Sequence, residues 1–333
     1  MRFSPIRSLI GALFALSPAT ALAWGHQAHV VIDRVAIEAL PADGPVFLRK
    51  YLDYITRSAT LPDKWRSASE PFAKIEEDPN HGWFREQFAF LEPVPRSRYA
   101  FILALYREHL RLKDNDPAAA ARMNVRWTGT LPYAVMEQYG QMVAEMRLLQ
   151  AARVKSNEAQ ARVLEQNVAH SVVRLGHYVG DGAQPLHDSV NSDGWRGDNP
   201  KAYTRDGKIH AQFESVYVAA IGLKVDDIRP LMTAPDPLAG DLFQQVLGFL
   251  NHSGDQMERV YALEKRGALG NPHDGEARDL VYQATAAGAA MLRDMIDRAW
   301  REAATLPPTT NPLDPASPDF DPATGSAPPP LGH

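Results

Sequence analysis

Apolar residues recur at intervals of three and four along most of this chain, and this spacing constrains its fold more than any other feature. The interval is that of an α-helix with one face turned to a core. It runs through residues 28–39, 133–152, 158–180, 239–264 and 275–302. Prolines stand between these segments, and few stretches alternate apolar and polar residues as half-buried strands do. We therefore predict an all-α, bundle-like single domain over about residues 24–304.

The start of the chain has a different pattern. Residues 1–23 carry two arginines, then an apolar run, and end with Ala21 and Ala23 as small residues. This is the pattern of a secretory signal peptide that is cleaved after Ala23. We expect an exported protein, periplasmic or secreted, whose mature chain begins at Trp24. No later apolar run reaches the length of about 18 residues that predicts a transmembrane helix.

The composition limits the ligands and partners that the chain can use. It has no cysteine, so a metal site must use histidine, carboxylate, water or the chain terminus. The formal net charge is −5, so binding of a polyanion requires a local site rather than overall attraction. Residues 305–333 hold nine prolines and few apolar residues, which predicts a disordered tail. No feature implies a protein partner.

Two histidine–carboxylate pairs are the strongest candidates for a binding site. His177 and Asp181 are four residues apart, and so are His210 and Glu214, so each pair shares one face if its segment is helical. His187 follows the first pair after a glycine and a proline that break a helix. Inward-facing pairs on neighbouring helices build multi-metal sites in helical bundles. The alternative for Glu214 is a solvated helix face.

Four further residues complete the candidate set. Trp24 would have a free amine after cleavage and lies close to His29, while Asp63 and His81 each follow a proline closely. A terminal amine, a carbonyl oxygen and an imidazole can together chelate a metal. Taken singly, each residue has an ordinary alternative, because Asp63 can be a helix N-cap and a lone histidine is usually a packing or surface residue. We expect such packing or surface roles for His26, His170, His252 and His273.

In their order along the chain, these nine candidates resemble the metal ligands of the S1/P1 nuclease and zinc-dependent phospholipase C superfamily. The family signature HxxGDxxQPLH stands at residues 177–187 as HYVGDGAQPLH. The resemblance covers roughly residues 24–220, within which 88–160 looks like an insertion relative to compact members. It implies an all-α fold that binds three zinc ions.

The resemblance also implies which residues hold each ion. One zinc would be bound by Asp63, His81, His177 and Asp181. A second would be bound by the amine and carbonyl of Trp24, by His29 and by the other oxygen of Asp181, which makes Asp181 a bridge. The third, more exposed zinc would be bound by His187, His210 and Glu214.

This ligand set implies hydrolysis of a phosphodiester by a zinc-activated hydroxide, because zinc lowers the pKa of bound water and neutralises charge on phosphate. Asp63, Arg66 and Asp181 would occupy catalytic positions. Arg66 matches a family arginine that reaches the scissile phosphate, where its guanidinium would clamp an oxygen. The alternative for Arg66 is an exposed helical arginine.

Finer features bear on the substrate. The short spacing between Trp24 and His29 matches the nucleases of the superfamily, which act on single-stranded DNA and RNA. Glu214, in contrast, matches the acidic ligand of the phospholipases. Trp83 and Phe84, shortly after His81, are displaced from the place where nucleases hold a base; they would stack on a base, cover a lipid headgroup or fill the core. We expect a nuclease. The alternatives are a phospholipase C acting on phospholipid headgroups and a non-catalytic zinc-binding protein.

Overall fold

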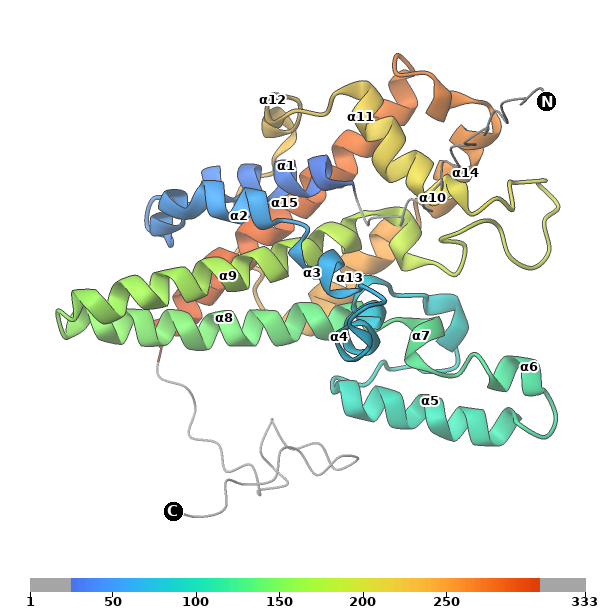
Figure 1. The fold of residues 1–333 in the computed structure, drawn as a ribbon, viewed down its shortest axis with the longest axis horizontal. Coiled ribbons are helices and arrows are strands. Elements are labelled where there is room, and N and C mark those ends of the chain that lie inside the picture. Colours follow the sequence, from blue (N-terminus) through green and yellow to red (C-terminus); the bar gives the residue numbers. More distant parts are fainter. Residues whose placement is uncertain (1–24, 306–333) are drawn as a thin grey trace, which may run out of the picture.

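The computed structural model describes residues 25–305. Over these residues the chain is all-α, as the helical spacing predicts, and the β-pairing described there is one isolated bridge between Trp83 and Gly129 (Figure 1). The predicted signal peptide, Trp24 and the proline-rich residues 306–333 lie outside the described residues.

Four long helices form the centre of the molecule. They are α1 (His26–Glu38), α8 (Leu131–Val154), α9 (Glu158–Ala183) and α15 (Gly275–Ala303). Helices α8 and α9 are joined by residues 155–157 alone, so they run antiparallel and lie side by side (Figure 1). Helix α15 packs against α1, α8 and α9. The core lies between these helices, where Met142, Val172 and Leu292 are completely buried.

Capping side chains fix the first turns of two of the long helices, α9 and α15. The side chain of Asn157 accepts a hydrogen bond from the backbone N–H of Gln160 at the start of α9. The side chain of Asp274 does the same for Ala277 at the start of α15. Each bond satisfies a backbone donor that has no partner within its helix.

Shorter elements surround this centre. Between α1 and α8 the chain forms η1 (Val46–Tyr51), α2 (Leu52–Ser58), α3 (Leu61–Trp65), α4 (Pro71–Glu77), η2 (Asp78–His81), η3 (Arg85–Phe88), α5 (Arg98–Leu112), α6 (Pro117–Ala120) and α7 (Val125–Thr128). Between α9 and α15 it forms η4 (Pro185–Asp188), α10 (Lys208–Ala211), η5 (Gln212–Tyr217), α11 (Val218–Ile221), α12 (Val225–Ile228), η6 (Arg229–Leu231), α13 (Leu242–Gly254), α14 (Met257–Lys265) and η7 (Ala268–Gly270). Of the η elements, η5 is a π-helix and the others are 3-10 helices.

One segment that was predicted to be a single helix forms two helices in the structure. The apolar spacing over 239–264 predicts one helix, whereas the structure has α13 and α14 with a break at Asp255 and Gln256. The N–H groups of these two residues close turns onto Asn251 and Ser253, so the chain changes direction without losing backbone hydrogen bonds. The apolar period continues across the break because both helices bury one face.

The segment 88–160 consists of two different parts. Helices α5, α6 and α7 form a layer at one end of the molecule (Figure 1). Helix α8, in contrast, is a central element that buries residues along most of its length against α9. The interpretation as an insertion therefore does not fit α8, without which α9 would lose its main packing partner.

A close contact fixes the carboxyl end of α9. A Cβ atom on Gly288 of α15 would lie only 3.0 Å from the Cβ of Ala183 and 3.2 Å from Ile32 of α1. Glycine at this position therefore lets the three helices approach closely at the end that carries the signature. None of the helices described in residues 25–305 is both long and apolar enough to cross a bilayer.

Candidate metal centre

Eight of the nine predicted ligands converge in two neighbouring groups, and all eight are buried. We call the first group the deep cluster: His29, Asp63, His81, His177 and Asp181. We call the second the rim cluster: His187, His210 and Glu214. Trp24, the ninth, lies outside the described residues. In both clusters, ligand atoms from three residues approach within 4.8 Å of one another, close enough to hold a metal ion.

The signature positions its residues through the end of α9. His177 and Asp181 share one face of the helix, with His177 Nε2 3.5 Å from Asp181 Oδ2. Helix α9 stops at Ala183, because Gln184 is extended and Pro185 cannot continue a helix. The N–H of His187 then bonds to the carbonyl of Gln184, which holds the turn that takes His187 to the rim cluster.

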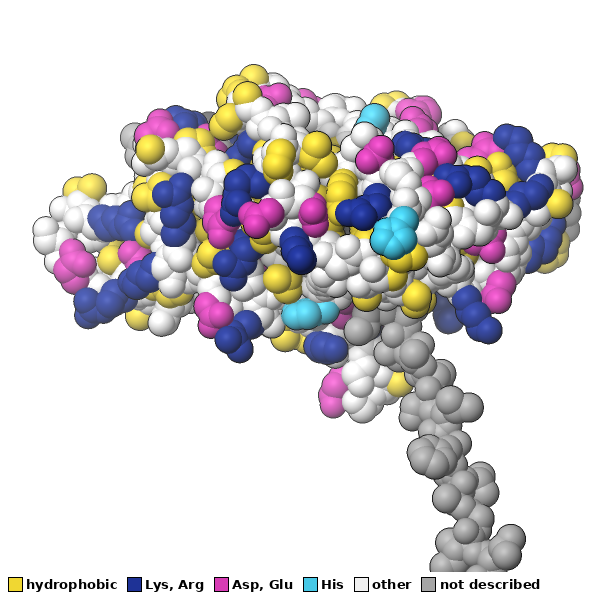
Figure 2. Space-filling view, turned by 90° about the horizontal axis from the view of Figure 1, so that it is seen from above, with side chains coloured by type: hydrophobic (Ala, Val, Ile, Leu, Met, Phe, Trp, Pro, Cys, Tyr) yellow, Lys and Arg dark blue, Asp and Glu magenta, His cyan; other side chains and the backbone are white. Residues whose placement is uncertain are grey.

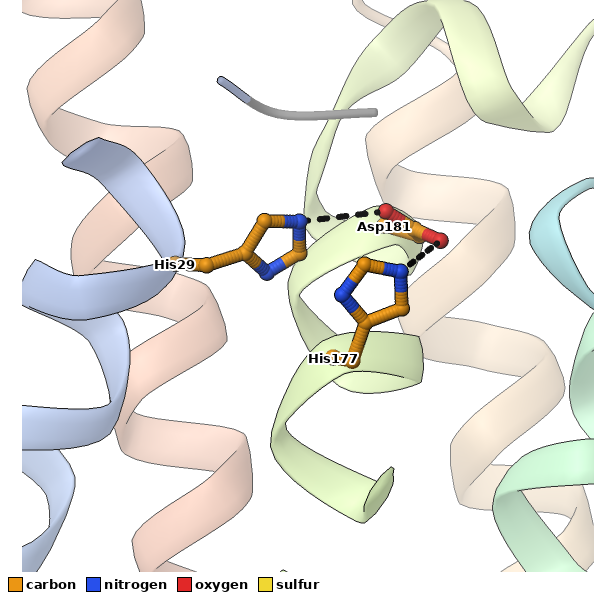
Figure 3. A group of neighbouring side chains, drawn as sticks. All are labelled: His29, His177 and Asp181. Atoms are coloured by element: carbon orange, nitrogen blue, oxygen red, sulfur yellow. Dashed lines mark ion pairs between the residues drawn. The ribbon is translucent and has the colours of Figure 1, made fainter. Parts of the chain in front are cut away.

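The glycine of the signature has a specific role. A Cβ atom at Gly180 would lie 2.6 Å from Nδ1 of His29. Glycine thus leaves room for His29 of α1 to reach Asp181 on α9. Figure 3 shows the result, in which one carboxylate oxygen of Asp181 faces His29 and the other faces His177; the first contact measures 3.4 Å.

The other half of the deep cluster comes from α3 and η2. His81 Nδ1 lies 2.8 Å from Asp181 Oδ2 and 3.2 Å from His177 Nε2. Asp63 Oδ1 lies 3.7 Å from His177 Nε2 and 3.8 Å from His81 Nδ1. Asp63 is not the N-cap of α3, a position that Thr60 takes, and its carboxylate is directed into the cluster.

Unsatisfied polar atoms indicate that the deep cluster fits a cation. Both ring nitrogens of His29, Oδ2 of Asp63 and Oδ1 of Asp181 are buried without a hydrogen-bond partner. Such atoms cost about 1–3 kcal/mol each when nothing replaces their lost water. Imidazole nitrogens and carboxylate oxygens are the ligands that zinc accepts in proteins, so the donor set fits this metal.

The rim cluster is built from a short stretch of chain. His210 Nε2 lies 3.0 Å from Glu214 Oε2 and 3.2 Å from His187 Nε2. Glu214 is completely buried, so the alternative of a solvated helix face is wrong. It lies in the π-helix η5, a geometry that is often found at functional sites. Its Oε1 has no partner, and the cluster therefore also fits a cation.

In most of the candidate histidines, the ring nitrogen that points away from the cluster has a partner that orients the ring. His177 Nδ1 lies 2.9 Å from the carbonyl oxygen of Ala59, and His187 Nδ1 contacts the carbonyl of His81. A partner of this kind fixes the proton on one nitrogen and leaves the other free to bind a metal. His210 differs, because its Nδ1 has no hydrogen-bond partner and makes an ion-pair contact of 3.4 Å with the carboxylate of Asp193.

Glu77 orients the ring of His81 in the same way as the carbonyl oxygens orient His177 and His187. This residue was not identified from the sequence. Its Oε1 lies 3.1 Å from His81 Nε2 and accepts a 2.7 Å hydrogen bond from the hydroxyl of Tyr178. Glu77 and Tyr178 are both buried. The spacing of four between Glu77 and His81 was a signal, but Pro79 between them argues against one continuous helix, which is why the pair was not recognised.

Within each cluster, acidic side chains and imidazoles shift one another's pKa values. Burial, reinforced by Asp181, raises the pKa of Asp63. Burial would also raise the pKa of Asp181, but its imidazole neighbours, His177 first, outweigh burial and hold this pKa well below its ordinary value. In the rim cluster, Glu214 and Asp193 overcome burial and raise the pKa of His210 to about 10. A cation bound here would therefore displace a proton.

A cavity of about 140 Å³ opens onto both clusters. Its lining includes His81 of the deep cluster and His187 and His210 of the rim cluster. Arg66 also lines it; its Nε lies 3.2 Å from Asp78, and its Nη1 lies 3.5 Å from Asp63. Arg66 is half-buried, so it is not the exposed helical arginine that we kept as an alternative.

The two aromatic residues after His81 have different places. Trp83 is 1% exposed and packs against Phe88 and Phe101, so the expected contact with a substrate is wrong for Trp83 in this structure. Phe84 lines the cavity and is half-buried. Adjacent residues of an extended segment point to opposite sides, which explains why only one of the pair reaches the site.

The four histidines with predicted packing or surface roles lie outside both clusters. Two of them make polar contacts, His170 with the hydroxyl of Tyr54 and His26 with Thr60. Comparison with protein-family models, curated proteins and solved structures gives no match to this chain.

Proposed function

We propose that this chain is an exported zinc-dependent phosphodiesterase of the S1/P1 nuclease type, and that it hydrolyses single-stranded DNA and RNA. The observation that carries the proposal is the convergence of eight predicted ligands in two buried clusters that share one cavity. The clusters contain no cysteine and need none, because imidazole and carboxylate ligands suffice for zinc.

The deep cluster would hold two ions with Asp181 between them, and the rim cluster would hold the third. The N-terminal amine of Trp24 is proposed as a ligand beside His29. This part is supported by Gly25, the first described residue, whose N–H donates a 3.1 Å hydrogen bond to the carbonyl of Glu214. When bound, zinc would activate water for attack on phosphorus and neutralise the negative charge that develops there.

The side chains of this protein would orient the substrate and the ligands. Arg66 uses Nε and Nη1 for Asp78 and Asp63, so its Nη2 is available to a phosphate oxygen in the cavity. Phe84 would stack on a nucleobase. Glu77 would keep the proton of His81 at Nε2, so that Nδ1, which faces the deep cluster, could bind a cation there.

The face of the molecule seen in Figure 2 shows no large patch of one charge that would attract a polyanion. On the face seen in Figure 2, lysine and arginine side chains are interspersed with aspartate and glutamate. The net charge of −5 likewise gives no long-range attraction for nucleic acid. Binding would therefore depend on the cations and aromatic residues at the cavity.

The experiment that tests this function uses protein purified after export, so that any signal peptide has been removed. Cleavage of single-stranded DNA, RNA and phosphatidylcholine is measured side by side, with zinc and with a chelator. We expect chelator-sensitive cleavage of both nucleic acids. Release of phosphocholine alone would assign the chain to the phospholipase C alternative, and zinc binding without any turnover would support the non-catalytic one.

A further inference from the structure

The segment around α7 is attached to the wall of the cavity. The N–H of Phe84 donates to the carbonyl of Thr128 at 2.8 Å, and the N–H of Thr130 donates to the carbonyl of Pro79 at 2.7 Å. Gly129 has a φ of +73°, and a Cβ there would lie 1.8 Å from the carbonyl oxygen of Gly82. Glycine is therefore required at 129, and α7 is held in a fixed position beside Phe84.

This attachment brings Arg126 to the cavity. Arg126 lines it together with Phe84, His187 and His210, yet its side chain is exposed and has no ion pair among the described residues. Arg66 differs, because Asp63 and Asp78 compensate its charge. Arg126 thus presents an uncompensated positive charge at the entrance, beside ligands of the rim cluster.

The next residue adds an aromatic surface. Trp127 is a large apolar side chain with 38% of its surface exposed, and the guanidinium carbon of Arg196 lies 5.8 Å from its ring centroid. The side chain of Arg196 is also exposed and has no ion pair among residues 25–305. It comes from the loop between His187 and His210, so the long spacing between these two ligands supplies a residue that lies beside Trp127 of α7.

We propose that Arg126, Trp127 and Arg196 form a second nucleotide-binding subsite, which holds the nucleotide next to the scissile phosphodiester of a single strand. The proposal rests on the function proposed above. An exposed indole provides a surface for any base, and the two arginines provide contacts for phosphates on either side of it. A phospholipid headgroup has one phosphodiester and no base, so it would leave the subsite without a ligand.

Binding of a single strand tests the subsite directly. The probe is a fluorescent, phosphorothioate-linked thymidine oligonucleotide of two or ten units, titrated against the zinc-loaded protein at several salt concentrations. We expect the wild type to bind the longer probe at least about tenfold more tightly, as one stacked base contributes. Trp127→Ala should lose most of this difference. Arg126→Ala and Arg196→Ala should each lower the slope of log affinity against log salt by about 0.7.

Matched controls separate this effect from general loss of charge or aromatic surface. Tyr99→Ala removes another exposed aromatic residue and Arg162→Ala another exposed arginine, and neither residue lies in α7 or in the loop between His187 and His210. Both should bind the longer probe like the wild type. Zinc content and melting temperature establish that each variant is folded.

Two different results would overturn the proposals separately. If the wild type cleaves single strands with zinc, but Trp127→Ala and both arginine variants bind the longer probe unchanged, the subsite is wrong and the proposed function stands. If the wild type neither binds nor cleaves single strands and releases phosphocholine instead, the proposed nuclease function is wrong, and the subsite with it.

Discussion

The deep cluster and the rim cluster use the same ligand types but are built in different ways. The deep cluster takes its side chains from four elements that are spread over residues 26–183, namely α1, α3, η2 and α9. The rim cluster uses η4, α10 and η5, which follow one another along the chain. His29, His177 and Asp181 are completely buried, whereas His187 and His210 line the cavity.

This difference predicts different behaviour of the ions that each cluster would hold. Ligands of the deep cluster meet only when α1, α9 and α15 are packed, so metal binding there is coupled to the fold. The rim cluster faces the cavity, so its ion can exchange without opening the helical core. We therefore expect a chelator to remove the rim ion first and the deep ions more slowly, because His81 is the one ligand of the deep cluster that lines the cavity.

The largest expected effect is that of Asp181→Asn. This change weakens a ligand that faces both halves of the deep cluster, so two ions should be affected at once. Losing one charge-stabilising partner of a transition state costs about 10²–10³-fold in rate, and we expect a loss of the order of 10³-fold or more here. Initial rates on single-stranded DNA and zinc content by mass spectrometry measure it. A loss no larger than that of Glu214→Asp would contradict the bridging role.

Glu214→Gln should weaken metal binding in the rim cluster and leave the deep cluster unchanged. The amide keeps the shape of the side chain but removes the charge that His210 and His187 face. We expect one zinc ion fewer per chain, an unchanged deep cluster and a loss of about 10²-fold in rate. Loss of all bound zinc in this variant would mean that the two clusters are not independent.

Glu77→Gln should weaken the deep cluster without touching a ligand. The neutral amide no longer holds the proton of His81 at Nε2, and loss of such a partner costs about 10–100-fold in metal affinity. We expect a value near the lower end, measured by competition with a chromophoric chelator, with the rim ion unaffected. Tyr178→Phe, which removes the second hydrogen bond to Glu77, should have a smaller effect in the same direction. Equal zinc affinity in wild type and Glu77→Gln would show that Glu77 is only structural.

The smallest effect concerns Asp33, a buried carboxyl group outside both clusters. Neither of its oxygens has a partner, and burial raises its pKa well above the ordinary value. Ionisation therefore destabilises the fold as pH rises from the unfolded-state pKa through the folded-state pKa. Asp33→Asn removes the ionisable group, so it should raise the free energy of unfolding at pH 7 by roughly 1 kcal/mol or more, since a shift of one pKa unit corresponds to about 1.4 kcal/mol.

This gain should disappear below about pH 4, where the carboxyl group is protonated in both states. Thermal unfolding at the two pH values measures it. Zinc content should stay unchanged, which also makes Asp33→Asn the control for Asp181→Asn on the same pair of helices. A destabilised variant at pH 7 would show that the carboxylate of Asp33 has a partner in solution.

Local patterns were sufficient to predict part of the fold and of the site. The bounds of α1, α8, α9 and α15 follow the apolar spacing closely, because each of these helices buries apolar residues along most of its length. His177 with Asp181 and His210 with Glu214 are close because a spacing of four places them on one helix face. That His29 reaches Asp181, in contrast, depends on the packing of α1 against Gly180, which no local pattern contains.

Features that depend on tertiary contacts could not be predicted from the sequence. Trp83 and Phe84 are adjacent aromatic residues, and only the packing of Trp83 on Phe101 decides which of them lines the cavity. Arg126 lies in a segment that looked like an insertion, and backbone hydrogen bonds that join Thr128 and Thr130 to residues 79–84 bring it to the cavity. The break between α13 and α14 was missed because both helices keep the same apolar spacing.

The most direct test of the account is a crystal structure of the exported protein with diffraction measured on both sides of the zinc absorption edge. The account predicts three anomalous peaks, two within the deep cluster on either side of Asp181 and one between His187, His210 and Glu214. Crystals grown with zinc that show no peak at either cluster would contradict the central claim that these buried histidines and carboxylates are metal ligands.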